Sequence, residues 1–230
     1  MDSGHHSAEF LLQLAGAPAS GKSQLAAAII GHAPAVIVNS DVVKSTLLDA
    51  GIEWKLAGPA AYQTLFALAD DFLGQGHSVI LDSPSHYAYI PENGERIARQ
   101  HGVPYRFIEL ICEDLDELRR RMAQRTPRRS QMPGLDQPPP DSGPNFSGAT
   151  RTGTHQWHTY GPAEGHLTLD TAEPFEKYLQ QALDYLGVRE LSGAGTFPPS
   201  PGRTGNRRRP AQARRTGPRP GRRCVQARFR

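Results

Sequence analysis

The sequence predicts an α/β fold: a three-layer sandwich in which helices cover both faces of a five-stranded, mainly parallel sheet. Short apolar runs alternate with amphipathic stretches from residue 10 to about residue 186, which is typical of repeated βαβ units. Each run is short and mostly apolar, as in strands that are buried on both faces. The predicted strands are Phe10–Ala15, Ala35–Asn39, Ser78–Asp82, Tyr105–Cys112 and Leu167–Asp170.

The stretches between the strands carry helix signals at their ends. The longest has apolar residues at helical spacing, with Pro59 at its expected start and Gly74 after its end. The next has acidic residues in its first turn and arginines later, which suits the helix dipole. The last has an apolar stripe followed by Gly187. The predicted helices are Gln24–Ile30, a helix that runs to Leu48, Pro59–Leu73, Asp114–Gln124 and Phe175–Leu186.

Two segments interrupt this alternation. Residues 133–165 are rich in proline and glycine and too long for an ordinary connection, so we expect a lid or an insertion there. Beyond Leu191 the chain consists mainly of Gly, Pro, Arg and Ser, and it has too few apolar residues to bury a core. We therefore expect one domain over residues 1–191 and a disordered Arg/Pro/Gly-rich tail over residues 192–230.

The charge is divided unevenly along the chain. The 230 residues include 26 Lys and Arg and 23 Asp and Glu, but residues 197–230 hold 11 Arg and no acidic residue. Residues 1–196 thus carry 15 basic and 23 acidic side chains. An acidic body argues against a basic nucleic-acid-binding surface on the folded part.

Other classes of protein are excluded by the apolar runs and the cysteines. No run reaches the roughly 18 apolar residues of a membrane helix, and the N-terminus lacks the basic region of a signal peptide. Cys112 and Cys224 are too few for a disulfide scaffold or a Cys-rich zinc site. We expect a soluble protein of the reducing cytoplasm without a membrane partner.

A P-loop is the strongest motif in the chain. Gly16 and Gly21 are followed by Lys22 and Ser23, at the spacing that the motif requires and between a strand pattern and a helix pattern. Backbone N–H groups of such a loop hold phosphate oxygens, the lysine reaches the terminal phosphates and the hydroxyl binds magnesium. The residues predicted to bind nucleotide are Gly16, Ala17, Pro18, Ala19, Ser20, Gly21, Lys22, Ser23 and Gln24.

Two acidic residues follow predicted strands, where open parallel sheets bind their ligands. Asp41 comes just after the second strand and could accept a proton from a substrate hydroxyl, with Lys44 about one helical turn further on. The alternative is that Asp41 only caps a helix. Asp82 ends an apolar strand of the Walker B form, which helps to hold magnesium beside Ser23, although such a strand could also end in a simple capping acid.

An arginine cluster leads from the fourth predicted helix into the Pro-rich segment. Phosphoryl transfer uses guanidinium groups that stabilise charge on the transferred phosphate, often from a closing segment. Arg121 and Arg125 share one helix face and are the predicted catalytic pair. A solvated helix end is the alternative for some members. The cluster consists of Arg119, Arg120, Arg121, Arg125, Arg128 and Arg129.

Together these motifs resemble small P-loop kinases, over roughly residues 8–188. The group includes polynucleotide 5′-kinases, zeta-toxin-like kinases, chloramphenicol phosphotransferase and AAA-type predicted ATP-dependent kinases. The resemblance implies a P-loop NTPase fold, a base or orienting role for Asp41, and ATP-phosphate contacts for Arg121 and Arg125. Polynucleotide kinases of this group usually have Arg where this chain has Lys44, which loses bidentate phosphate geometry.

The expected function is transfer of the γ-phosphate of ATP, with magnesium, to a hydroxyl of a small molecule. Lys22, Asp41, Arg121 and Arg125 are the expected catalytic residues, and the acceptor is expected between Asp41 and the predicted helix Pro59–Leu73. One alternative is a 5′-hydroxyl polynucleotide kinase, in which the Arg-rich tail attracts the nucleic acid. Another is an ATP-binding or ATP-hydrolysing switch without a phosphate acceptor.

Overall fold

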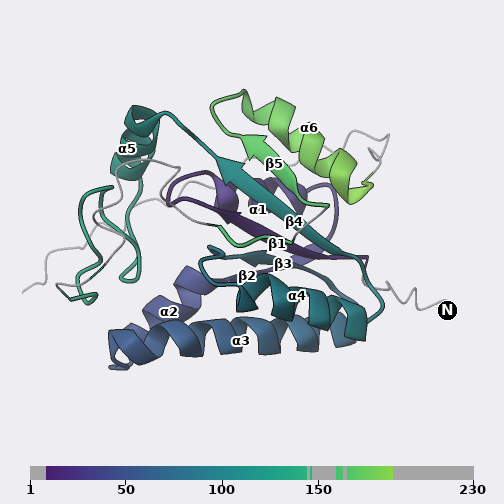
Figure 1. Cartoon of the computed structure of the whole chain (residues 1–230), viewed down its shortest axis with the longest axis horizontal. Helices are drawn as coiled ribbons and strands as arrows, with labels where there is room; N and C mark the ends of the chain where they lie inside the picture. Colours follow the sequence, from purple (N-terminus) through teal and green to yellow (C-terminus); the bar gives the residue numbers. More distant parts are fainter. Residues whose placement is uncertain (1–8, 144–145, 147–158, 163–164, 189–230) are drawn as a thin grey trace, which may run out of the picture. The chain divides into compact units, whose positions relative to one another are not determined.

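The computed structural model describes residues 9–143, 146, 159–162 and 165–188. The tail predicted at residues 192–230 and much of the lid or insertion predicted at 133–165 lie outside the described residues. The elements in chain order are β1 Leu11–Gly16, α1 Lys22–Ile29, β2 Ala35–Asn39, α2 Ser40–Asp49, α3 Trp54–Gly74, β3 Ser78–Asp82, α4 Tyr89–Gln100, β4 Tyr105–Ile111, α5 Leu115–Gln124, β5 Leu167–Asp170 and α6 Phe175–Leu186 (Figure 1).

The sheet confirms the predicted fold class. Its five strands run in the order β2-β3-β1-β4-β5, and each neighbouring pair is parallel. In the register, Gly16 of β1 pairs with Leu110, and Asn39 of β2 pairs with Asp82 of β3. Parallel strands end at the same edge of the sheet. The P-loop after β1, the start of α2 after β2 and Asp82 at the end of β3 therefore all lie at that edge.

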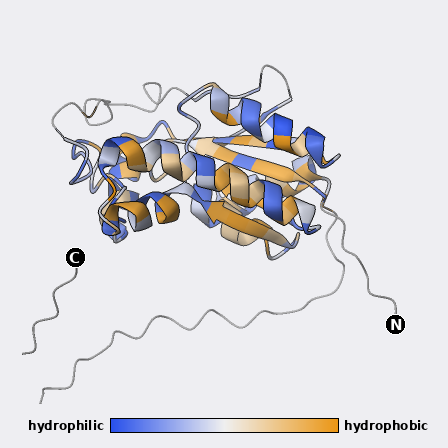
Figure 2. Ribbon diagram, turned by 90° about the horizontal axis from the view of Figure 1, so that it is seen from below, coloured by the Kyte–Doolittle hydropathy of each residue, from blue (hydrophilic) through white to orange (hydrophobic). Residues whose placement is uncertain are grey.

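Helices pack on both faces of the sheet, with α1 and α6 on one and α3 and α4 on the other (Figure 1). Leu12 and Leu14 of β1 face α1 and α6, whereas Leu11 faces α3 and α4. All three are fully buried, and each stabilises the fold by about 1.5–3 kcal/mol relative to an exposed side chain. Figure 2 shows strands made mainly of hydrophobic residues between helices of mixed character.

A smaller cluster joins the P-loop to α5 and to the chain that follows it. Ala17 packs with Cys112, Leu118, Met122 and Met132 of this third cluster. These contacts place the end of α5 and the residues after it over the P-loop edge of the sheet. In the described part of the chain, no helix has the length and apolarity needed to cross a bilayer.

Two helices differ from the sequence prediction. The helix expected to start at Pro59 begins at Trp54, because Leu56 N and Ala57 N donate to Glu53 O at 3.0 and 2.9 Å and build a turn before the proline. Pro59 therefore lies inside α3, where it removes one backbone donor from the helix.

Helix α4 is absent from the predicted elements. It contains Pro91 and Gly94, two residues that usually mark loops, but each has a local reason to be tolerated. Pro91 is the third helical residue, where no intrahelical donor is needed. Gly94 contacts Tyr105, and a Cβ there would lie 2.4 Å from an atom of its ring.

Candidate active site

The P-loop turns sharply between β1 and α1. Gly16 has φ +130°, and a Cβ on it would lie 2.2 Å from the carbonyl oxygen of Leu110. Gly21 caps α1 with φ +99°, and Ala19 also has a positive φ of 64°. Only a residue without Cβ fits the first position, and the turn brings the N-terminus of α1 to the edge of the sheet, which favours anions.

Most of the predicted nucleotide-binding residues line one cavity. They are Gly16, Pro18, Ala19, Gly21, Lys22, Ser23 and Gln24. Ala17 and Ser20 differ, because their side chains are buried behind the loop, with exposures of 4% and 0%. These two residues support the turn through packing and backbone: Ser20 N donates to Ala17 O at 3.2 Å.

Lys22 lies over the loop that precedes it. Its Nζ donates to the carbonyl oxygens of Gly16 and Ala17 at 2.9 and 2.8 Å. Burial lowers the pKa of Lys22, and the negative charges of Asp82 and Asp41 oppose that shift. The ammonium is thus near both carboxylates that the sequence singles out.

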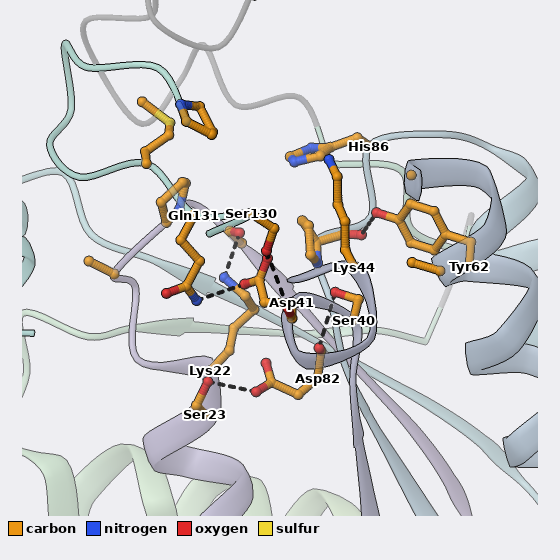
Figure 3. A pocket seen from close by; sticks show the side chains of 18 of the residues that line it. Lys22, Ser23, Ser40, Asp41, Lys44, Tyr62, Asp82, His86, Ser130 and Gln131 are labelled. Atoms are coloured by element: carbon orange, nitrogen blue, oxygen red, sulfur yellow. Dashed lines mark hydrogen bonds between the residues drawn. The ribbon is translucent and has the colours of Figure 1, made fainter. Parts of the chain in front are cut away.

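Ser23 and Asp82, the residues that the sequence proposes for magnesium, are hydrogen-bonded to each other (Figure 3). Ser23 Oγ donates to Asp82 Oδ2 at 2.6 Å, and Asn39 Nδ2 donates to the same oxygen. Burial raises the pKa of Asp82, while the hydrogen bond from Ser23 and the charge of Lys22 oppose that shift. Asn39 therefore fixes the carboxylate from the neighbouring strand.

The side-chain oxygens of Ser23 and Asp82 fit Mg²⁺ as ligands. A serine hydroxyl and a carboxylate are hard oxygen ligands, and Mg²⁺ is commonly held by one or two carboxylates together with substrate phosphates. Among the described residues, no group of three or more His, Cys, Asp or Glu could hold a metal. Magnesium at Ser23 and Asp82 would thus complete its shell with phosphate oxygens and water.

Asp41 lies in the first turn of α2, but it does not cap that helix. Asn39 is the N-cap, and its Oδ1 accepts from Val42 N at 3.0 Å. The capping alternative for Asp41 is therefore wrong. Instead its carboxylate lies on the cavity wall, where Ser130 Oγ donates to Oδ1 at 3.0 Å and Gln131 Nε2 donates to Oδ2 at 2.8 Å (Figure 3).

The segment that follows α5 is attached along α2. Ser130 N donates to Ser45 Oγ at 3.1 Å, one turn after Asp41. Arg129 donates to both carboxylate oxygens of Asp141 at 2.7 and 3.0 Å, and to Leu48 O at 2.8 Å. The Ser130 and Gln131 side chains are thereby held against Asp41.

The two predicted catalytic arginines lie on the cavity but differ in their contacts. Arg121 donates to Thr171 Oγ1 at 3.0 Å and to Thr171 O at 2.7 Å, and it is also bonded to Glu117 at 2.7 Å. Arg125 donates to Met132 O at 3.0 Å, and its buried Nε has no hydrogen-bond partner within the described residues. Arg125 has donors left for an anion, whereas Arg121 ties α5 to the end of β5.

The cavity has a volume of about 1320 Å³ and extends beyond the P-loop. Its far half lies between Asp41 and α3, where the sequence predicts the acceptor. Lys44 Nζ lies 3.3 Å from the centroid of the Trp54 ring, a cation–π contact, and it extends toward His86 (Figure 3). Burial lowers the pKa of Lys44 to about 8, against the opposing charge of Asp41.

Several residues of this site are missing from the sequence prediction. Ser130 and Gln131 follow the arginine cluster but carry no motif, and they lie about ninety residues from Asp41 in the chain. Asn39 could have been found, because it ends a strand two residues before Asp41. Aromatic residues on the cavity are also missing from the prediction, among them Trp54, Tyr62, Tyr87 and Tyr89.

Residues 11–135 match the family model for an AAA domain. The chain belongs to this AAA domain family. The resemblance that the sequence motifs indicate is thereby confirmed. No curated protein sequence matches the chain. The AAA domain match covers the P-loop, Asp41, Asp82, both cavity-lining arginines and the Ser130–Gln131 pair.

Solved structures share the fold of this AAA domain at low sequence identity. A sugar kinase from Janibacter sp. HTCC2649 is 15% identical with a TM-score of 0.53, covering 79% of this chain and 95% of its own. The Mycobacterium tuberculosis APS kinase CysC, in complex with AMPPNP and APS, is 16% identical with a TM-score of 0.54, covering 79% and 98%. A gluconokinase from Sinorhizobium meliloti 1021 is 15% identical with a TM-score of 0.50, covering 79% and 93%.

Proposed function

We propose that this AAA domain protein is a kinase that transfers the γ-phosphoryl group of ATP, with magnesium, to a hydroxyl of a small molecule. The observation that carries the proposal is the position of Asp41. Its carboxylate is held by two donors on the wall of the same cavity that the P-loop and the Ser23–Asp82 pair line. An ATP-hydrolysing switch can use a carboxylate to activate water, but it has no need of the cavity half between Asp41 and α3.

The size of the cavity supports two bound molecules. Pockets for one small ligand measure roughly 300–1,000 Å³, and this one measures about 1320 Å³. Nucleotide phosphates would occupy the half formed by the P-loop and the start of α1. The acceptor would occupy the half between Asp41 and α3. The folds shared with a sugar kinase, an APS kinase and a gluconokinase agree with this division.

In the proposed reaction the acceptor oxygen bonds to the γ-phosphorus while the bond from that phosphorus to the β–γ bridging oxygen breaks. Asp41 orients the acceptor hydroxyl and takes its proton, an effect worth about 10²- to 10⁴-fold in rate. The positive charges of Lys22 and Arg125 stabilise the negative charge on the transferred phosphoryl group and on the departing ADP. Magnesium, when bound, neutralises charge on the phosphates, and Ser23 and Asp82 are the residues that would hold it.

A polynucleotide kinase is the second candidate that the sequence raises. A nucleic-acid acceptor would bring backbone phosphates, which are normally bound by Lys and Arg side chains. On the acceptor side of the cavity, α3 contributes Trp54, Gly58, Pro59, Ala61, Tyr62, Gln63 and Phe66, which carry no formal charge. This lining favours a small molecule over a strand of nucleic acid.

Transfer of labelled γ-phosphate from ATP tests the proposal. The full chain is offered a metabolite extract in one reaction and 5′-hydroxyl oligonucleotides in another. Lys22→Ala removes the phosphate contact, and Asp41→Asn keeps the shape of the side chain but removes the base. We expect label in a small molecule with the parent protein, and a loss of at least about 100-fold in both variants.

The other outcomes separate the candidate functions. Label on the oligonucleotides would favour the polynucleotide kinase. Label found only in free phosphate, at a rate that Asp41→Asn leaves unchanged, would refute the kinase and favour the switch. Thermal unfolding of each variant shows whether a loss of transfer reflects a loss of folded protein.

A further inference from the structure

The acceptor half of the cavity is rich in aromatic side chains. Seven cavity-lining residues are Phe, Tyr or Trp, in a chain with only 8 Phe, 7 Tyr and 2 Trp. Five of them come from α3, from the chain that joins β3 to α4, and from the first residue of α4. We call these five the aromatic wall: Trp54, Tyr62, Phe66, Tyr87 and Tyr89.

Three tyrosines of the aromatic wall form two faces at right angles. The rings of Tyr87 and Tyr89 are stacked, with centroids 5.5 Å apart and an interplanar angle of 14°. The Tyr62 ring stands at 89° to Tyr87 and at 87° to Tyr89, with centroids 6.4 and 6.0 Å away. Such an arrangement offers both a stacking and an edge-to-face contact to a planar ligand.

The stacked pair is not covered by the described protein. Tyr87 is 55% exposed and Tyr89 is 38% exposed, although large aromatic rings are usually buried for the most part. Tyr62 presents its ring rather than its hydroxyl to the cavity, because its Oη donates to Pro84 O at 2.9 Å. The exposed ring surface at the cavity therefore remains available for a ligand.

Charge is concentrated on the opposite side of the cavity. Lys22, Arg121 and Arg125 belong to the P-loop side, whereas the lining residues of α3 and of the chain from Pro84 to Tyr89 include no Lys, Arg, Asp or Glu. Lys44 is the exception: its ammonium lies 3.3 Å from the centroid of the Trp54 ring in the aromatic wall, and this cation–π contact already engages its charge. A carboxylate, phosphate or sulfate on the acceptor would need cationic donors that the aromatic wall does not supply.

We propose that the acceptor is an uncharged alcohol with an aromatic ring, which packs on Tyr87 and Tyr89 while its hydroxyl reaches Asp41. This inference rests on the proposed kinase function for the division of the cavity. It sets the substrate class apart from sugar acids and other anionic polyols. Tyr87 and Tyr89 are then the residues that determine acceptor specificity.

The test measures binding and transfer separately. The probes are 2-phenylethanol and uridine, with D-gluconate and myo-inositol as non-aromatic alcohols. Saturation-transfer NMR with the full chain, magnesium and saturating AMPPNP, which blocks the nucleotide half, reports binding of each probe. A parallel assay measures transfer of labelled phosphate from ATP to the same four compounds.

Two variants of one residue isolate the ring contact. Tyr87→Ala removes the ring, and Tyr87→Phe keeps it while removing only the hydroxyl. Because Tyr87 is more than half exposed, both variants should fold, which thermal unfolding checks. We expect an aromatic probe to bind about 2- to 12-fold more weakly to Tyr87→Ala than to Tyr87→Phe.

Each result decides the inference. Binding of gluconate or inositol but of neither aromatic probe, or equal aromatic binding by the two variants, would overturn it. Lys22-dependent transfer to polyols alone would overturn it and leave the kinase function standing. Ring-dependent binding without phosphate transfer to these probes or to any compound of a metabolite extract would support the aromatic site and refute the kinase.

Discussion

Replacing Gly16 by alanine should damage both the fold and nucleotide binding. The new Cβ would lie 2.2 Å from Leu110 O, an overlap with backbone of the neighbouring strand that no side-chain rotation relieves. Overpacking of this kind costs about 1–3 kcal/mol, and a positive φ costs an L-residue about 1–2 kcal/mol. We therefore expect the free energy of unfolding to fall by about 2–5 kcal/mol, a large part of the roughly 5–15 kcal/mol of a typical domain.

Gly51→Ala is the matched control for this change. Gly51 also has a positive φ, of +86°, but a Cβ there would meet nothing within 4 Å. Gly51→Ala thus has the conformational cost of a positive φ without the clash, and its free energy of unfolding should fall by no more than about 2 kcal/mol. Urea unfolding gives both free energies, and a thermal-shift titration with AMPPNP gives nucleotide binding. Equal stability of the two variants, or unchanged AMPPNP binding by Gly16→Ala, would refute the reasoning.

Burial lowers the pKa of Lys44 to about 8, so the rate of phosphate transfer should fall above about pH 8 as Lys44 loses its charge. Lys44→Arg should remove this fall. A rate of transfer by the parent protein that stays constant up to about pH 10 would contradict the prediction. In the unfolded chain Lys44 keeps its proton up to about pH 10.5, so the free energy of unfolding should rise between about pH 8 and pH 10.5. Asp82→Asn should weaken magnesium-dependent AMPPNP binding about 10-fold, measured by magnesium titration; equal titration curves would exclude the site. Arg121→Ala should lower the free energy of urea unfolding by about 1.5–3 kcal/mol through the lost bonds to Thr171. Arg125→Ala should instead lower kcat and have a smaller effect on the free energy of urea unfolding. If Arg125→Ala mainly lowered the unfolding free energy and Arg121→Ala mainly lowered kcat, Arg125 would be the structural arginine and Arg121 the catalytic one.

The sequence predicts the sheet and the nucleotide half of the site because both depend on local patterns. Strand positions follow from apolar runs, and the P-loop follows from glycine spacing that has a steric cause, visible at Gly16. The pairing of Ser23 with Asp82 follows from the topology, because both residues lie at the same edge of a parallel sheet.

The acceptor half was harder to predict, because long-range contacts assemble it. Ser130 and Gln131 reach Asp41 only after the chain has passed through two strands and three helices, and no spacing rule connects them. Tyr87 lies just before α4 and Tyr89 is its first residue, and the proline and glycine of this helix obscure its pattern. The capping alternative for Asp41 failed for a simpler reason: Asn39, two residues earlier, caps the same helix.

The hydrogen bonds of Arg129 also bear on how this chain tolerates changes in length. The ion pair between Arg129 and Asp141 closes a short loop, and Arg129 fixes that loop to the end of α2 through Leu48 O. Chain added or removed after Gly143 would begin beyond this closure and leave Ser130 against Asp41. The contacts that hold Ser130 against the Asp41 carboxylate thus lie within α2 and residues 129–141.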